Sequence, residues 1–162
     1  MSKTKKIITN PEIYVSPKIE LPRLVPNRIH RANLEFYDID HFGISYEGRV
    51  FLNNPKATYT TPKTPKNGYV GSFHIFGHGG VCLGGKGHCT PPSKKQGAYD
   101  LRREHMMHPI FKSVRITEQL KKIIKTRKDI VVTVVPILMG VDETGMKSIF
   151  RFKKMTLMTY DK

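Results

Sequence analysis

The segment IVVTVVPIL, residues Ile130–Leu138, most constrains what this chain can fold into. All of its residues except Pro136 and Leu138 are β-branched. This composition is typical of a strand that is buried on both faces or that crosses the core of a β-sandwich. Because proline has no backbone N–H, we expect Pro136 to lie at an edge of the sheet or at a bulge.

Shorter segments with strand-like alternation surround this one, and a single helix interrupts them. The expected helix follows Ile116, with Thr117 as its N-cap and Leu120, Ile123 and Ile124 as its apolar face. A change of phase across Lys153-Lys154 predicts a β-bulge in the last strand. The other expected strands are Leu34–Ile39, Ile44–Leu52, Tyr69–Phe76, Phe111–Ile116 and Ile149–Tyr160. We therefore predict an all-β fold, an antiparallel β-sandwich with one short helix.

The length of 162 residues fits one such domain. Residues 1–31 contain four prolines and little periodicity, which predicts an extended N-terminal arm that is either disordered or laid across the domain surface. Residues 32–162 are then the β-sandwich domain. No apolar stretch is long enough to span a membrane, and the N-terminus lacks the apolar core of a signal peptide, so we expect a cytoplasmic protein.

A long Gly/His/Cys-rich loop follows the strand at Tyr69–Phe76. Residues 71–89 read GSFHIFGHGGVCLGGKGHC and hold both cysteines of the chain and three of its seven histidines. Imidazole and thiolate groups bind zinc and copper, so one flexible loop could wrap a tetrahedral ion. The metal ligands that we predict are His78, Cys82, His88 and Cys89, with His74, His105 and His108 as additional candidates.

Two alternatives for the same loop stay open. Cys82 and Cys89 could pair in a disulfide that closes a small loop, or they could remain unlinked thiols in a structural segment. A reducing compartment would favour thiols or metal ligands over a structural disulfide.

The order of the segments resembles the C-terminal β-sandwich domain of tyrosinase and plant polyphenol oxidase chains. Similar G-S-F, I-T and V-T-V-V-P segments occur in the same order there, and here they stand at Tyr69–Phe73, Val114–Thr117 and Val131–Pro136. The resemblance covers about Leu34 to Tyr160. In that family, catalysis belongs to a separate, mainly helical domain in which six histidines hold a pair of copper ions. The resemblance further implies that the β-sandwich packs over this site and can shield it.

The sequence contains no helical segment of that kind. The pair His74 and His78 has the helical i, i+4 spacing, but it lies where a predicted strand gives way to glycine. We therefore expect no enzyme but a non-catalytic accessory or interaction module that acts by protein contacts over or beside a partner. The resemblance suggests a separately encoded tyrosinase-like catalytic chain, or a larger assembly, as this partner.

Two other functions remain as alternatives. One is a metal-binding protein that carries zinc or copper in the Gly/His/Cys loop. The other is a polyanion-binding protein, because 28 Lys and Arg residues against 13 Asp and Glu give a net charge of +15. Such an excess attracts nucleic acid through its long-range field. The basic residues are scattered, however, and no RRM, KH, zinc-finger or helix-turn-helix signature accompanies them.

Overall fold

A computed structural model describes residues 11–41, 43–77, 110–139 and 148–161. These ranges contain strands, one α-helix and one 3-10 helix, and all strand pairs are antiparallel. The strands are β1 (Tyr14–Val15), β2 (Ile19–Glu20), β3 (Ile29–Ile39), β4 (Tyr46–Leu52), β5 (Tyr69–Ile75), β6 (Ile110–Arg115), β7 (Asp129–Ile130), β8 (Val132–Leu138) and β9 (Lys154–Asp161). The helices are η1 (Pro65–Asn67) and α1 (Thr117–Ile123).

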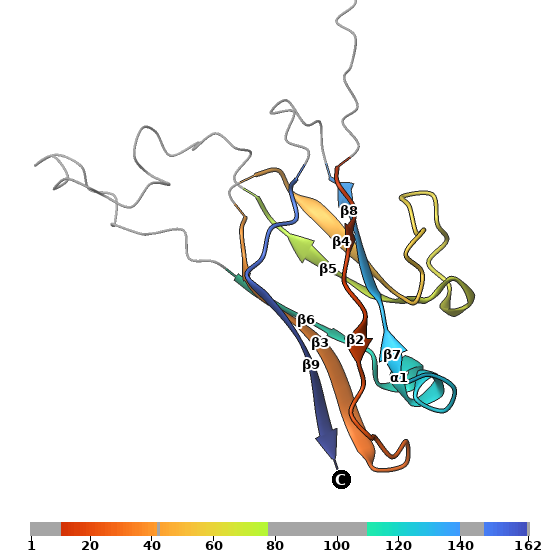
Figure 1. Ribbon diagram of the computed structural model, residues 1–162. Helices are drawn as coiled ribbons and strands as arrows, with labels where there is room; N and C mark the ends of the chain where they lie inside the picture. The colour runs from red at the N-terminus through yellow and green to blue at the C-terminus, as the bar shows by residue number, and fades with distance from the viewer. Residues whose placement is uncertain (1–10, 42, 78–109, 140–147, 162) are drawn as a thin grey trace, which may run out of the picture.

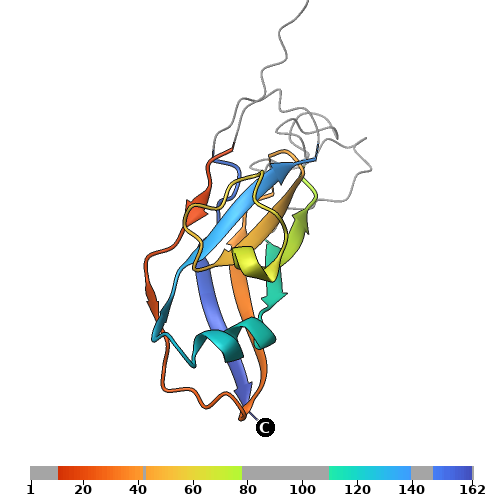
Figure 2. The same ribbon diagram turned by 90° about the vertical axis from the view of Figure 1, so that its right-hand side faces the viewer.

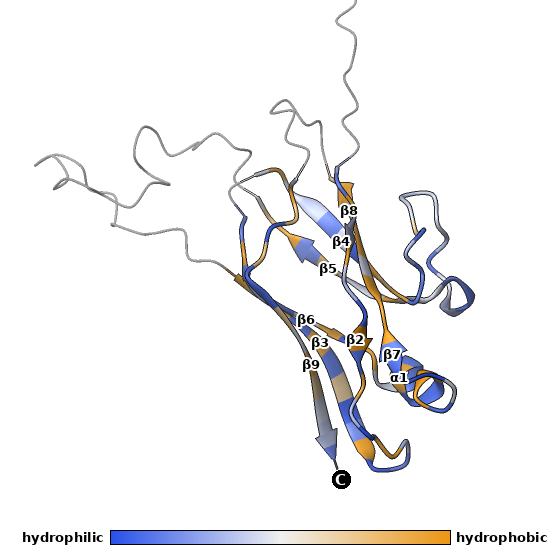
Figure 3. Ribbon diagram, viewed as in Figure 1, coloured by the Kyte–Doolittle hydropathy of each residue, from blue (hydrophilic) through white to orange (hydrophobic). Residues whose placement is uncertain are grey.

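Two larger sheets form the layers of the molecule (Figures 1 and 2). The first sheet has the strand order β1-β8-β4-β5, the second has the order β6-β3-β9, and β2 pairs with β7 beside them. In Figure 3, β8 is predominantly hydrophobic, whereas β3 alternates between hydrophobic and hydrophilic residues. The predicted all-β, sandwich-like fold with one short α-helix is thereby confirmed.

Aromatic rings join the two sheets at the centre of the core. Phe36 of β3 lies 5.4 Å from Phe73 of β5 and 5.7 Å from Phe150, measured between ring centroids. Tilted and edge-on contacts of this kind add to the stabilisation from burial. Gly48 of β4 leaves room for this packing, because a Cβ atom there would lie 2.4 Å from the Phe73 ring.

Helix α1 closes one end of the sandwich with its buried Leu120, but the predicted N-cap is wrong. Ile116 occupies the capping position, and Thr117 is the first helical residue. The Thr117 hydroxyl oxygen accepts a hydrogen bond from the Ala32 N–H at 3.0 Å, inside the protein. Thr117 therefore connects α1 to β3. Its hydroxyl accepts from the Ala32 N–H of β3 and makes no capping hydrogen bond to the first turn of α1.

The last strand also differs from its prediction. β9 begins only at Lys154, so the phase change across Lys153-Lys154 marks the start of the strand. The predicted β-bulge at this position is wrong. Before that point the chain crosses the core, where Ile149 and Phe150 are buried. The register shifts occur in β3 instead, at both of its ends.

The first described residues run along the sandwich. β1 pairs with Val134 and Thr133 of β8, and β2 pairs with β7. β3 begins at Ile29, so residues 29–31 of the segment that we assigned to the arm belong to a sheet. Pro136 pairs with Gly48 of β4, and β1 stops short of it on the other side, which agrees with the expected edge position. No helix in the described ranges has both the length and the hydrophobicity needed to cross a membrane.

Candidate functional site

Most of the predicted metal ligands lie outside the described residues, so the metal site and the Cys82–Cys89 disulfide stay predictions. His74 is the exception: it is an exposed residue of β5 and lies opposite Glu47 of β4. Within the described ranges, no three His, Cys, Asp or Glu side chains come together in a way that could hold a metal ion. The predicted ligands outside the described residues are His78, Cys82, His88, Cys89, His105 and His108.

A first candidate site lies on the outer face of the β1-β8-β4-β5 sheet. The β4 register, continued by one residue, places Ser45 beside Phe76 and Met139, and the Met139 N–H donates to the Ser45 carbonyl at 3.0 Å. Because side chains alternate between the faces of a strand, these residues point away from the core residue Tyr46. Phe76 is 75% exposed and Met139 is 54% exposed. We call this row the Phe76–Met139 patch.

An ionic cluster lies next to the patch on the same face. The carboxylate of Glu47 accepts hydrogen bonds from Lys63 Nζ at 2.6 Å and from Arg49 Nε at 3.0 Å. Burial by itself would raise the pKa of Glu47, but the hydrogen bonds from Lys63, Arg49 and Ser72 outweigh it and lower the pKa to about 2. Glu47 is therefore a charged anchor for the loop that carries Lys63.

That loop covers the other end of the same face. Ala57 of this loop packs with Phe51 and Val135 in a second buried apolar cluster, separate from the main core. Among the described residues, the outer face is thus covered over Phe51 and exposed at the Phe76–Met139 patch. Exposed apolar side chains that gather on one face of a sheet mark interaction sites more often than scattered ones do.

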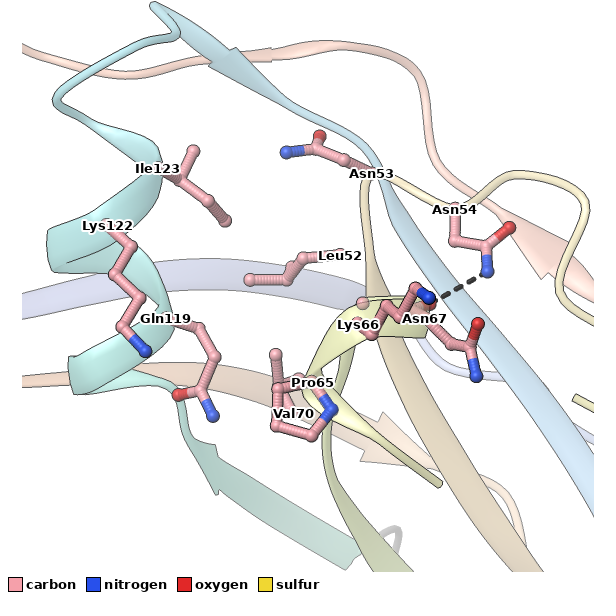
Figure 4. Close-up of a pocket in the computed structure, with 11 residues that line it drawn as sticks. Leu52, Asn53, Asn54, Pro65, Lys66, Asn67, Val70, Gln119, Lys122 and Ile123 are labelled. Carbon is pink, nitrogen blue, oxygen red and sulfur yellow. Dashed lines mark hydrogen bonds between the residues drawn. The ribbon is translucent and has the colours of Figure 1, made fainter. Parts of the chain in front are cut away.

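A second candidate site is a groove of about 410 Å³ between α1 and η1 (Figure 4). Its walls come from segments that are far apart in the sequence, with Gln119, Lys122 and Ile123 on the α1 side. The remaining lining residues are Leu52, Asn53, Asn54, Pro65, Lys66, Asn67, Gly68 and Val70.

Backbone geometry fixes the η1 wall of this groove. The Asn54 side-chain amide donates to the Asn67 carbonyl at 2.8 Å, and the Leu52 N–H donates to the Gly68 carbonyl at 2.8 Å. Gly68 has φ 82°, in the left-handed region, and a Cβ atom there would lie 2.3 Å from the Leu52 carbonyl oxygen. Glycine is required at this position on both grounds.

Neither site was predicted from the sequence. The patch depends on the register of three strands, and the groove depends on the approach of η1 to α1. A local signal for the groove does exist in Pro65-Lys66-Asn67-Gly68, since proline at the start and glycine at the end are typical of a short helical turn.

The strands, sheets and core define an antiparallel all-β sandwich class, and comparison with solved structures shows where else this fold occurs. Latent aurone synthase (polyphenol oxidase) from natural source aligns with a TM-score of 0.52 and 16% identity, over 99% of this chain and 28% of that chain. Recombinantly expressed latent aurone synthase co-crystallized with hexatungstotellurate(VI) and soaked in H2O2 aligns with a TM-score of 0.53 and 16% identity, over 93% and 24%.

At this level of identity the likeness shows a shared fold, and the chain spans only about a quarter of the length of these enzymes. No protein-family model matches the sequence, and no curated protein does. The fold is therefore tyrosinase-family-like, as the order of the sequence segments implied.

Proposed function

We propose that this chain is a non-catalytic accessory module that acts by protein contacts on a polyphenol-oxidase-like catalytic domain. The observation that carries the proposal is the fold similarity, which extends over 99% of this chain but only 28% of the latent aurone synthase chain. The rest of that enzyme has no counterpart in these residues. In this proposal the catalytic domain lies outside these 162 residues.

The Phe76–Met139 patch is the contact surface of this proposal. Phe76 is the most exposed large hydrophobic side chain of the described residues, and Met139 lies in the same row on the other side of Ser45. Burying one such side chain contributes about 1.5–3 kcal/mol. Exposed aromatic and methionine side chains are also the types that are enriched at protein interfaces. A partner with an apolar recess would therefore gain most of its affinity from these two residues.

The consequence of binding is restricted access to the catalytic site of the partner. The polyphenol oxidases with this fold are described as latent. In the proposed complex, the module covers the partner and slows turnover without contributing a reacting group of its own. The metal-binding and polyanion-binding functions remain alternatives.

A turnover assay tests this proposal. The full chain, supplied with copper, is assayed for catechol oxidation alone and then mixed with a polyphenol oxidase catalytic domain. We expect no turnover by the chain alone, co-elution with the catalytic domain in size-exclusion chromatography, and a lower rate that levels off at one equivalent. Catechol oxidation by the chain alone, or an unchanged rate and no co-elution, would overturn the proposal.

A further inference from the structure

We propose that the groove between α1 and η1 binds a small organic anion, a carboxylate or phosphate group attached to a compact apolar body. The groove has a volume of about 410 Å³, which lies within the range of small-molecule sites. The groove lies at the Leu52 end of β4, and the Phe76–Met139 patch lies at the Ser45 end. The two sites are roughly 24 Å apart along the strand. The two sites are therefore independent of each other.

The floor of the groove is apolar. Leu52 is 3% exposed and belongs to the main core, and Val70 and Ile123 pack against that core while still lining the groove. Pro65 adds a further apolar surface from η1, opposite the helix (Figure 4). A flat or compact hydrocarbon group would cover this floor and displace water from it.

The rim is cationic, and its described lining residues include no carboxylate. Lys66 comes from η1 and Lys122 from α1, and none of the eleven lining residues is acidic. No ion pair joins either lysine to another described residue, whereas the adjacent Lys121 pairs with Glu118 at 3.5 Å. Figure 4 shows the Lys122 nitrogen beside Gln119 on the α1 side and the Lys66 side chain on the η1 side, towards Asn54. Two ammonium groups that border one groove, with no carboxylate among its lining residues, favour an anionic ligand.

Polar groups of the walls are already held in place. The Asn53 side-chain oxygen accepts a hydrogen bond from the Val131 N–H at 3.0 Å, and Asn67 donates to Thr64 Oγ1 at 3.0 Å. Together with Asn54 and Gly68, these contacts fix the groove before any ligand arrives. A preformed site loses less free energy to ordering when it binds. The Gln119 amide, which extends from α1 on the same side as Lys122, adds a neutral hydrogen-bonding group (Figure 4).

Nuclear magnetic resonance titration of the full chain tests this site with three probes. Phenyl phosphate carries both the anion and the apolar body, inorganic phosphate carries only the anion, and benzyl alcohol carries only the body. We expect phenyl phosphate to shift the backbone amides of Val70, Gly68 and Lys122 in a saturable manner, with a Kd on the order of 0.1–1 mM. Each of the other two probes should bind at least about tenfold more weakly.

Charge-matched variants separate this site from general attraction to a basic protein. The double variant Lys66→Gln/Lys122→Gln should weaken phenyl phosphate binding about tenfold, the equivalent of 1.4 kcal/mol. The control Lys125→Gln/Lys128→Gln removes the same charge from exposed positions outside the groove and should change the Kd by less than about twofold. All four lysines can be replaced without disturbing the core.

Four results would overturn the proposal. They are the absence of saturable shifts with phenyl phosphate, equal affinity for inorganic phosphate, equal affinity for benzyl alcohol, and equal weakening in the control variant. Equal affinity for inorganic phosphate would mean that charge alone attracts the ligand. None of these results bears on the contact of the Phe76–Met139 patch with a catalytic domain, so the two proposals can fail separately.

Discussion

Lys63 and Glu47 join the loop after β4 to the outer face of the sheet, with Lys63 Nζ 2.6 Å from Glu47 Oε1. The Glu47 side chain is only 12% exposed, so its charge depends on this partner and on Arg49. Replacing Glu47 with Gln removes the charge and leaves one neutral oxygen acceptor for the two cations, which each contact a carboxylate oxygen in wild type. We expect Glu47→Gln to lower the free energy of unfolding at pH 7 by up to about 3 kcal/mol, as measured by urea denaturation.

The same pair sets the pH dependence of stability. The pKa of Glu47 falls from 4.5 to about 2 in the folded protein, because its hydrogen bonds outweigh the effect of burial. The stabilisation is therefore complete above about pH 4.5 and is lost as the pH falls towards 2. Wild type should lose more stability than Glu47→Gln between pH 5 and pH 2.5, to an extent of about 2–3 kcal/mol. Parallel losses in the two proteins would contradict this account.

Thr117 provides a second test, because its hydroxyl oxygen accepts the buried Ala32 N–H. Thr117→Val keeps the shape of the side chain but leaves that donor unpaired, which costs about 1–3 kcal/mol. Thr117→Ser retains the hydroxyl and should lose less than about 1 kcal/mol. Thermal and chemical denaturation of both variants gives the comparison. Equal stability of the two would show that the hydrogen bond contributes nothing.

For Tyr46 we expect that removal of the hydroxyl causes no loss of stability, in contrast to Thr117. Its hydroxyl is buried and has no hydrogen-bond partner among the described residues. Burial, and then the negative charge of Asp40, raise the pKa of this phenol, so it stays neutral. Tyr46→Phe should leave the free energy of unfolding unchanged or raise it by up to about 1 kcal/mol, since an unpaired polar atom is removed. The matched variant is Tyr37→Phe, which loses a hydrogen bond to Glu35 and should be destabilised. A greater loss in Tyr46→Phe than in Tyr37→Phe would contradict the assignment.

Gly68 determines the η1 wall of the groove through its positive φ and its contact with the Leu52 carbonyl. An alanine there would be strained and would push η1 away from β4. Gly68→Ala should therefore lower the free energy of unfolding by more than about 2 kcal/mol. Lys66→Ala, in the same turn but exposed, should stay within about 0.5 kcal/mol of wild type. If Gly68→Ala were as stable as Lys66→Ala, the turn would have to adopt another conformation.

The sequence predicted the strands and the helix better than it predicted where they end or how they pack against one another. Strand composition placed β8, and the spacing of Leu120, Ile123 and Ile124 placed α1, because both signals are local. The ring cluster of Phe36, Phe73 and Phe150 depends on contacts between sheets that no local pattern contains.

The same distinction explains the errors. A threonine before an amphipathic segment is typical of an N-cap, but here the buried Ala32 N–H uses the hydroxyl. The phase change at Lys153-Lys154 was a real signal that marked the start of β9. The Phe76–Met139 patch and the groove arise only when distant segments meet, so sequence patterns could indicate at most the η1 turn of the groove. The predicted ligands His78, Cys82, His88 and Cys89 lie outside the described residues and stay predictions.

Calorimetric titration tests the proposed binding of the Phe76–Met139 patch to a polyphenol-oxidase-like catalytic domain. The titration uses such a domain freed of its own β-sandwich. We expect Phe76→Ser/Met139→Ser to weaken binding at least about tenfold with little change in Tm. The control Phe111→Ser/Met158→Ser, at exposed positions on the other sheet, should bind as wild type does. No binding by the wild-type chain, or equal binding by the patch variant, would contradict the account.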